Sequence, residues 1–235
     1  VVVNRDRASK LAAVNILYRV GARNDNPART GFAHLFEHLM FRGTRAVENF
    51  DLPVQMASGD NNAFTNNDYT DFYITLPKDN LETALWLESD RMEGLDITPA
   101  KLEAEKKVVI EEFRQRYLNQ PYGDQTMLLR ALAYKVHPYR WAAIGLATDH
   151  IAGATLADVE SFYRAHYRPS NAILSISADM EEERMLELAE KWFAPLADHP
   201  SETAAIPQEP VQTQARRQEV ERDVPASTVT VAYHM

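Results

Sequence analysis

Residues 31–44 read GFAHLFEHLMFRGT, an apolar stretch that nevertheless carries several ionisable groups. His34 and His38 stand four positions apart, and Glu37 directly precedes the second histidine. On a helix, positions i and i+4 share one face, so both imidazoles could reach the same metal ion. Glu37 would project beside that face, where its carboxylate could take a proton from a metal-bound water. We therefore expect a helix over residues 31–41 that presents a metal site.

The residues around these three groups favour a metal site over a solvated stripe of polar side chains. Charged groups in an apolar environment are costly unless they are paired or bind a metal, and neutral imidazoles with a carboxylate around Zn²⁺ meet that requirement. The order His-x-x-Glu-His is also a known signature of zinc hydrolases. The surrounding residues, which should bury most of the helix, are Leu35, Phe36, Leu39, Met40 and Phe41.

A third ligand is needed, because catalytic zinc uses three protein ligands and keeps one open position. The best candidates lie in residues 103–112, EAEKKVVIEE. At about 100° per residue, Glu105 and Glu112 fall within one apolar arc, two helical turns apart, and Glu111 points nearly the opposite way. We assign Glu112 as the third ligand and Glu105 as an outer group that orients a histidine or tunes the water. The alternative is that both carboxylates lie at the edge of the arc and reach solvent.

The composition sets limits on partners and compartment. The chain has 235 residues, a formal net charge of −9 and no cysteine. Interspersed charges with an acidic balance argue against a nucleic-acid partner, which needs a basic face. A chain without cysteine suits both the cytoplasm and the periplasm; the periplasm is our guess, and the compartment stays open. No stretch approaches the roughly 18 apolar residues of a membrane span, and no signal peptide is visible.

The apolar pattern predicts an α+β domain with a largely antiparallel sheet packed with helices. Residues 11–20 (LAAVNILYRV) are typical of a buried strand, and we expect them to pair with residues 1–3 across a polar turn. Thr98 and Pro99 are typical of the cap and first position of a helix that runs to about residue 118. We also expect helices at residues 48–58, 81–92, 125–136, 156–167 and 181–193, strands at residues 62–65, 69–76, 171–178, 217–222 and 227–233, and a polar connector at residues 201–213.

Further short motifs accompany Gly21 and the stretch 31–44 along the chain. They are NAFT (62–65), DYT (68–70), EKKVVIEE (105–112), HP (137–138), IG (144–145), FY (162–163) and YRPSN (167–171). Together they resemble the pitrilysin-type peptidases, or inverzincins. That family includes insulin-degrading enzyme, the mitochondrial processing peptidase and many bacterial two-domain zinc peptidases. The resemblance covers essentially the whole chain.

This resemblance implies a zinc endopeptidase that cleaves extended peptides. His34, His38 and Glu112 would bind Zn²⁺, and Glu37 would act as the general base on the zinc-bound water. Glu105 matches an extra acidic residue that the family carries seven positions before the ligand, and we assign it a supporting catalytic role. The implied fold is that of a pitrilysin or mitochondrial-processing-peptidase domain.

The resemblance also implies where the substrate binds. The strand formed by Asn62, Ala63, Phe64 and Thr65 matches the edge strand along which a peptide adds as a further strand, an arrangement called β-augmentation. Family members usually carry Gly-Gly before this strand, whereas Ser58-Gly59-Asp60 stands here. We therefore expect the turn before the strand to differ slightly.

Length gives a second departure, since family members carry two similar domains. We expect residues 1–235 to correspond to the metal-bearing N-terminal domain alone, with low activity until a homologous second domain or a partner subunit is supplied. One alternative is a non-catalytic or structural subunit of a heteromeric pair, against which the intact motif weighs. Another is a zinc-stabilised binding domain, although the motif contains no fourth ligand. The remaining histidines, expected to be structural or surface residues, are His137, His150, His166, His199 and His234.

Overall fold

Alternation along strand β2 (Leu11–Tyr18) sets the character of the sheet. Every second residue of β2 is fully buried, and the residues between them are more exposed. The computed structural model describes residues 1–198 and 205–234. In it, Val14 pairs with Ile74 on one side and with Ile176 on the other. Apolar side chains from three strands therefore meet in one layer, as in a sheet with one face on the core.

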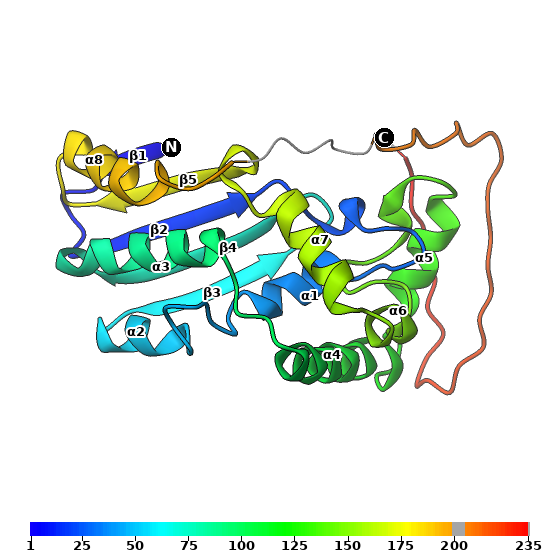
Figure 1. The fold of residues 1–235 in the computed structure, drawn as a ribbon. Coiled ribbons are helices and arrows are strands. Elements are labelled where there is room, and N and C mark those ends of the chain that lie inside the picture. The colour runs from blue at the N-terminus through cyan, green and yellow to red at the C-terminus, as the bar shows by residue number, and fades with distance from the viewer. Residues whose placement is uncertain (199–204, 235) are drawn as a thin grey trace.

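Within the described residues, the strands form one five-stranded sheet in the order β1-β5-β2-β4-β3 (Figure 1). Three of the strand pairs are antiparallel, and only β1 and β5 run parallel. This confirms the predicted α+β class. The remaining strands are β1 (Val2–Arg5), β3 (Asp60–Thr65), β4 (Thr70–Pro77) and β5 (Ala172–Ala178).

The predicted pairing of residues 1–3 with residues 11–20 is wrong. β5 lies between β1 and β2, so Val2 pairs with Ser175 rather than with a residue of β2. β5 buries Leu174, Ile176 and Ala178, whereas β1 is short and none of its four residues is buried. The more apolar strand takes the inner position, and the short one forms an edge, as is common in natural sheets.

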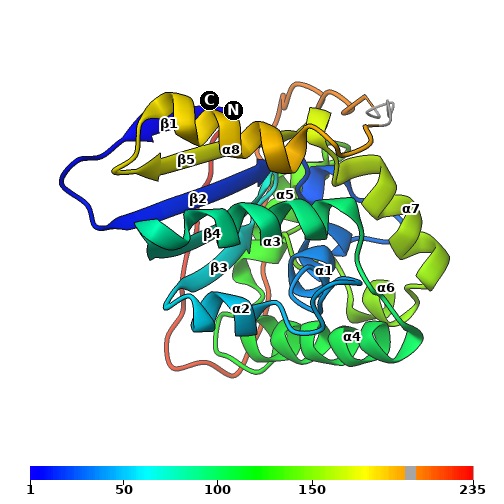
Figure 2. The ribbon, with the colours of Figure 1, turned by 60° about the vertical axis from the view of Figure 1, so that its left-hand side comes forward.

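The helices gather in two places. α2, α3 and α8 cover one face of the sheet, while α1 and α4 to α7 lie near the end at which β2 and β3 terminate (Figures 1 and 2). The second group is the one that carries the predicted site. The helices are α1 (Phe32–Leu39), α2 (Asp51–Met56), α3 (Leu81–Glu93), α4 (Pro99–Phe113), α5 (Gln125–Ala133), α6 (Thr148–Ala152), α7 (Leu156–His166) and α8 (Glu182–Phe193).

Several helix boundaries differ from those expected. α1 is shorter than residues 31–41 because Gly31, in a left-handed conformation (φ 95°), precedes its first turn. α2 covers only part of residues 48–58. α4 begins after Thr98 as predicted but ends at Phe113, where a single π-helical turn (Arg114–Leu118) continues the chain. Within residues 1–198 and 205–234, no helix combines the length and apolar character that a membrane crossing needs.

The strand pair predicted at residues 217–222 and 227–233 is also wrong. Residues 205–234 contain neither helix nor strand. Val229, Val231 and Tyr233 alternate as in a strand but are 91%, 67% and 85% exposed. A two-stranded ribbon without an apolar face to cover is marginal at best, so the pattern alone does not produce a strand here. The first four residues of the predicted connector at residues 201–213 lie outside the described residues.

Candidate metal centre

Helix α1 separates apolar side chains from ionisable ones. Phe32, Leu35, Phe36 and Leu39 are at most 4% exposed and pack into the core. His34, Glu37 and His38 lie on another side of the helix; His34 is 8% exposed, and the other two are partly buried. The spacing of the motif therefore does what helical geometry predicts, and brings the three groups to one side.

Helix α4 supplies the acidic partners. The hydroxyl of Thr98 accepts the N–H of Lys101 (3.2 Å) and caps the helix. Glu105 is 2% exposed, Glu112 is partly buried, and the side chain of Glu111 is 51% exposed. The two carboxylates two turns apart thus face inward while their neighbour faces solvent, as the sequence predicts.

The side chains of α1 and α4 converge on one point. Glu112 Oε2 lies 3.6 Å from His34 Nε2 and 3.3 Å from His38 Nε2, and these three potential ligand atoms are all within 4.8 Å of one another. His38 Nδ1 lies 3.2 Å from Glu105 Oε2. Across the described part of the chain, no other set of three histidine or acidic groups converges in this way. The predicted ligands are therefore neighbours, and Glu105 stands behind one of them.

Two arginines that the sequence analysis did not assign complete this cluster. Arg116 Nη2 lies 2.9 Å from Glu112 Oε1, so the opposite carboxylate oxygen of Glu112 faces the histidines. Arg42 forms an ion pair with Glu105. Arg116 stands four positions after Glu112, so helical spacing could have found it. Arg42 follows the end of α1 and reaches Glu105 of a different helix, so helical spacing does not predict its contact.

The two histidines have opposite charge preferences. Burial lowers the pKa of His34 to about 4, although Glu112 beside it works in the other direction. Burial also lowers the pKa of His38, but hydrogen bonds to Glu105 and Glu112 outweigh it and raise the pKa to about 9. The hydrogen bond with His38 lowers the pKa of Glu112. Before any metal binds, the cluster therefore holds a positive charge on His38 and a negative charge on Glu112.

The surroundings of Glu37 favour its protonated form more than water does. Burial raises the pKa of its carboxyl group, and a hydrogen bond from the side chain of Thr65 opposes that shift. A raised carboxyl pKa moves towards neutrality, where a general acid or base works best. Because Thr65 ends β3, this contact also brings the predicted substrate strand to the cluster.

The residues present fit a zinc ion. Two imidazoles and one carboxylate form one of the donor sets used by catalytic zinc. His34 Nδ1 is buried without a hydrogen-bond partner in the described residues. His38 Nδ1, by contrast, contacts Glu105, in the manner by which an outer carboxylate orients a ligating imidazole. One imidazole is thus already oriented for metal binding.

The remaining histidines lie away from this cluster. The Nδ1 atom of His150 accepts the N–H of Thr30 at 3.1 Å, and that of His137 accepts the N–H of Tyr139 at 3.1 Å. Burial lowers the pKa of His166 to about 4. His234 contacts the carbonyl of Ala133. These four have structural contacts, and His199 lies outside the described residues.

Strand β3 presents a free edge beside the cluster. Within the described residues it pairs only with β4, from Asp60 opposite Thr75 to Thr65 opposite Thr70. The turn before it contains Ser58 in a left-handed conformation (φ 57°). A Cβ on Gly59 would lie 2.9 Å from the carbonyl oxygen of Thr75, so glycine is needed there. The single glycine and the strained serine together make the turn for which relatives were expected to use two glycines.

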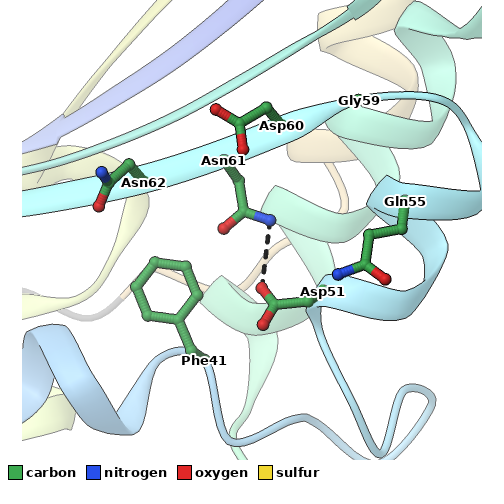
Figure 3. Close-up of a pocket in the computed structure, with 7 residues that line it drawn as sticks. All are labelled: Phe41, Asp51, Gln55, Gly59, Asp60, Asn61 and Asn62. Atoms are coloured by element: carbon green, nitrogen blue, oxygen red, sulfur yellow. Dashed lines mark hydrogen bonds between the residues drawn. The ribbon is translucent and has the colours of Figure 1, made fainter.

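A cavity of about 320 Å³ lies at the opposite end of β3 from Thr65 (Figure 3). Its lining is largely polar, and Asn61 Nδ2 donates to Asp51 Oδ1 across it at 3.2 Å. The cavity is thus separate from the histidine cluster but lies along the same strand edge. Its lining residues are Phe41, Asp51, Gln55, Gly59, Asp60, Asn61 and Asn62.

Two sequence profiles of one peptidase family match the chain. Residues 1–142 match the sequence profile described as insulinase (peptidase family M16), and residues 153–235 match one described as the peptidase M16 inactive domain. The boundary between the two matches does not divide the sheet, because β5, in the second match, lies between β1 and β2 of the first.

Curated relatives include zinc proteases and processing peptidases. The chain is 35% identical over 214 residues to the zinc protease PqqE of Helicobacter pylori, covering 89% of this chain and 48% of that protein. It is 24% identical to the probable mitochondrial-processing peptidase subunit beta of Arabidopsis thaliana, covering 96% and 43%. The chain therefore spans about half the length of the curated relatives it matches.

Solved structures share the fold. The crystal structure of a protease from Helicobacter pylori superposes with a TM-score of 0.81 at 34% identity, covering 88% of this chain and 51% of that one. The first half of the periplasmic protease PqqL from Escherichia coli superposes with a TM-score of 0.76 at 22% identity, covering 87% and 46%. At that lower identity the likeness concerns the fold alone.

Proposed function

The chain belongs to the insulinase family, peptidase family M16, and from this premise we propose that it is the zinc-binding part of an endopeptidase that hydrolyses extended peptides. The observation that carries the proposal is the convergence of His34, His38 and Glu112, whose ligand atoms lie within 4.8 Å of one another. Glu37, on the same helix, supplies a carboxylate beside them. This combination is what peptide hydrolysis with a metal requires.

The ligands His34, His38 and Glu112 would hold the metal. When bound, zinc would act as a Lewis acid that polarises the scissile carbonyl and makes a water molecule more acidic. Glu37 would take a proton from the attacking water and deliver it to the leaving amine, a role that its raised pKa supports. Glu105 would act as a positioning residue, because its carboxylate contacts His38 Nδ1 and fixes the orientation of that ring.

The substrate would lie along the edge of β3. Those backbone N–H and C=O groups of the stretch Asn62, Ala63, Phe64 and Thr65 that point away from β4 would hydrogen-bond an extended peptide as an added strand. Such binding depends mainly on the peptide backbone, so it suits substrates of varied sequence. The contact between Thr65 and Glu37 supports this position, since it relates the strand edge to the base.

Full activity would need a second unit. The chain spans 48% of the length of the Helicobacter pylori zinc protease, and other relatives are named as subunits. A homologous second domain or partner subunit would complete the cleft around the peptide. The alternative, a non-catalytic subunit of a peptidase pair, draws support only from the description of the second matching profile as an inactive domain. The complete set of ligands and base favours the catalytic reading.

The test measures zinc content and peptide cleavage on the same preparations. We expect about one zinc per chain, and cleavage of a fluorogenic peptide that is low for residues 1–235 and rises when the homologous half is supplied. Glu37→Gln should keep zinc and lose about a hundred- to ten-thousand-fold in cleavage rate. Glu111→Gln makes the same change in charge at an exposed position of α4 and should leave both measurements unchanged.

Each outcome addresses a separate part of the proposal. A wild-type chain that binds no zinc would contradict the metal site. Normal cleavage by Glu37→Gln would contradict the assignment of the base. Vigorous cleavage by residues 1–235 alone would contradict the need for a second unit.

A further inference from the structure

Helix α1 begins without a cap of its own. The first N–H groups of any α-helix lack intrahelical partners and need acceptors from elsewhere. Gly31, which precedes α1, has no side chain to offer, and its left-handed conformation leaves no room for one, since a Cβ would lie 2.6 Å from the carbonyl oxygen of Ile144. The helix that carries three of the proposed site residues therefore depends on another part of the chain for its start.

Asp25 supplies the missing acceptors from six positions upstream. Its Oδ2 accepts the N–H of Gly31 at 2.7 Å, and its Oδ1 accepts the N–H of Ala33 at 3.0 Å. Asp25 is 4% exposed, so both bonds are shielded from water. A negative charge is also favourable at a helix N-terminus, because the helix dipole has its positive end there. One side chain thus fixes both the entry into α1 and its first turn.

Asp25 is itself held by surrounding structure. Its own N–H donates to the carbonyl of Ala22 at 3.2 Å, and the same carbonyl accepts the indole N–H of Trp141 at 2.7 Å. The N–H of Ala22 donates to the carbonyl of Asn66 at 3.0 Å, in the turn that joins β3 to β4. The carboxylate therefore ties α1 to a fixed point near the end of the substrate strand.

This placement has an energetic cost. Burial raises the pKa of Asp25 to about 7, although the N–H groups of Gly31 and Ala33 oppose that shift. Ionisation of this carboxyl group is therefore less favourable than it would be in water, and the two hydrogen bonds that the carboxylate accepts offset part of that cost. Those bonds end at Ala33, the residue directly before His34.

We propose that Asp25 is a positioning residue of the metal centre, whose carboxylate sets the place of α1 so that His34 and His38 meet Glu112 of α4. The inference rests on the zinc site proposed above. Ligands from two helices must converge within a few tenths of an ångström for zinc, so a small shift of α1 would weaken binding at all three. Asp25 acts through the backbone of α1 and touches neither metal nor substrate.

The test compares zinc affinity in matched variants of residues 1–235. The zinc dissociation constant is measured by competition with a chromogenic chelator, and the melting temperature of the metal-free chain is recorded alongside. We expect Asp25→Ala to bind zinc about ten- to a hundred-fold more weakly, as when an outer partner of a ligand is lost. Asp25→Asn retains one acceptor and should recover part of the affinity.

A second helix cap provides the control. Thr155 caps α7, a helix without proposed ligands, and its hydroxyl accepts the N–H of Asp158 at 3.3 Å. Thr155→Ala should lower the melting temperature but leave zinc affinity unchanged. Equal zinc affinity in Asp25→Ala and the wild type would overturn the proposal, as would an equal loss in Thr155→Ala. A wild type that binds no zinc would instead overturn the proposed function.

A measurement on the wild type covers the case in which the Asp25 variants do not fold. Zinc should slow hydrogen exchange at the amides of Gly31 and Ala33, because binding at His34 and His38 would hold α1 against Asp25. Unchanged exchange at these two amides, in a chain that does bind zinc, would contradict the coupling.

Discussion

Carboxylates with basic partners occur in two very different surroundings in this molecule. Between α1 and α4, Glu105 and Glu112 lie among histidines in a site where Glu105 is 2% exposed. Along residues 205–234, Glu209 accepts the N–H groups of Lys135, Val136 and His137 at 2.7 to 2.9 Å, and its side chain is 13% exposed. In the first region, neighbouring side chains shift one another's pKa values. In the second, one carboxylate attaches residues 205–234 to the loop at residues 135–137.

The cluster between α1 and α4 has groups suited to chemistry, whereas Glu209 attaches one segment of the chain to another. In the buried cluster, opposing carboxylates and imidazoles leave a charged histidine and a proton-accepting carboxyl group side by side. For Glu209, burial disfavours ionisation, but three N–H groups lower the pKa to about 2, so the side chain stays ionised and its bonds are all satisfied. Glu209, whose acceptor oxygens have partners, therefore has a structural role. Of the two regions, only the cluster between α1 and α4 gathers groups that could bind a cation.

The largest effect should follow loss of the ligand that joins the two helices. In Glu112→Gln the carboxylate facing both histidines becomes a neutral amide, so zinc affinity should fall by more than the roughly ten- to hundred-fold that loss of an outer partner costs. Elemental analysis after dialysis, with Glu111→Gln as the matched variant, measures this. Unchanged zinc content in Glu112→Gln would show that the cluster is not the metal site.

Next in size is the dependence of zinc binding on pH. Zinc needs neutral imidazoles, and the pKa of His38 in the metal-free cluster is raised to about 9, so binding below that pH must release a proton. Zinc affinity should therefore rise about tenfold per pH unit up to about 9. Calorimetry in buffers of different ionisation enthalpy counts the protons released; a count of zero at neutral pH would contradict this.

The same shift has a consequence for the metal-free fold. A histidine pKa raised on folding contributes stability that is fully present below its unfolded value of about 6.5 and is lost as the pH rises through about 9. The lowered pKa of His34 acts oppositely and removes stability as the pH falls from about 6.5 towards 4. The melting temperature of the metal-free chain should thus be highest near neutral pH, and a midpoint that climbs steadily to pH 10 (roughly one unit beyond the His38 value) would contradict it.

A smaller and more local effect is expected at Glu209. Glu209→Gln removes the charge that three N–H groups share, which should cost the attachment of residues 205–234 about 1.5 to 3 kcal/mol, the range for hydrogen bonds to charged groups. Hydrogen exchange at Lys135, Val136 and His137 should accelerate, while zinc affinity stays the same. Glu219→Gln, at a 76% exposed carboxylate, is the control. A change in zinc affinity would show that the two regions are coupled.

The smallest effect is expected at the other ion pair of that segment. Arg222 Nη2 lies 2.7 Å from Asp124 Oδ2, but the arginine side chain is 52% exposed. Exposed pairs of this kind contribute little, so Arg222→Ala should change stability by less than about 1 kcal/mol. A chemical denaturation curve checks this, and a larger loss would mean that residues 205–234 support the fold rather than lie on it.

Much of the metal centre could be predicted from the sequence. The period of an α-helix is fixed by its own backbone, so the spacings of His34, His38 and the two glutamates of α4 were enough to place each set on one side of a helix. Thr98 and Pro99 likewise marked where α4 begins. These are local relations, and they need no knowledge of what lies across the core.

Strand partners could not be predicted in this way. β1 pairs with β5, about 170 residues later, although β2 lies next to it along the chain. Residues 227–233 have the alternation of a strand, yet Val229 and Tyr233 have nothing to cover. A strand pattern states which side chains could be buried, whereas the edge that buries them depends on every other strand in the sheet.

The sequence by itself therefore determined the family, through the motifs that resemble it, and the fold class, through the apolar pattern. It also determined the groups that meet at the candidate site, because helical spacing is a local property. Only the tertiary structure decided the strand order, the state of residues 205–234, and the contacts of Asp25 and Arg42 with the site. Those contacts join separate elements, and which side chain reaches which backbone group is settled only when the elements pack.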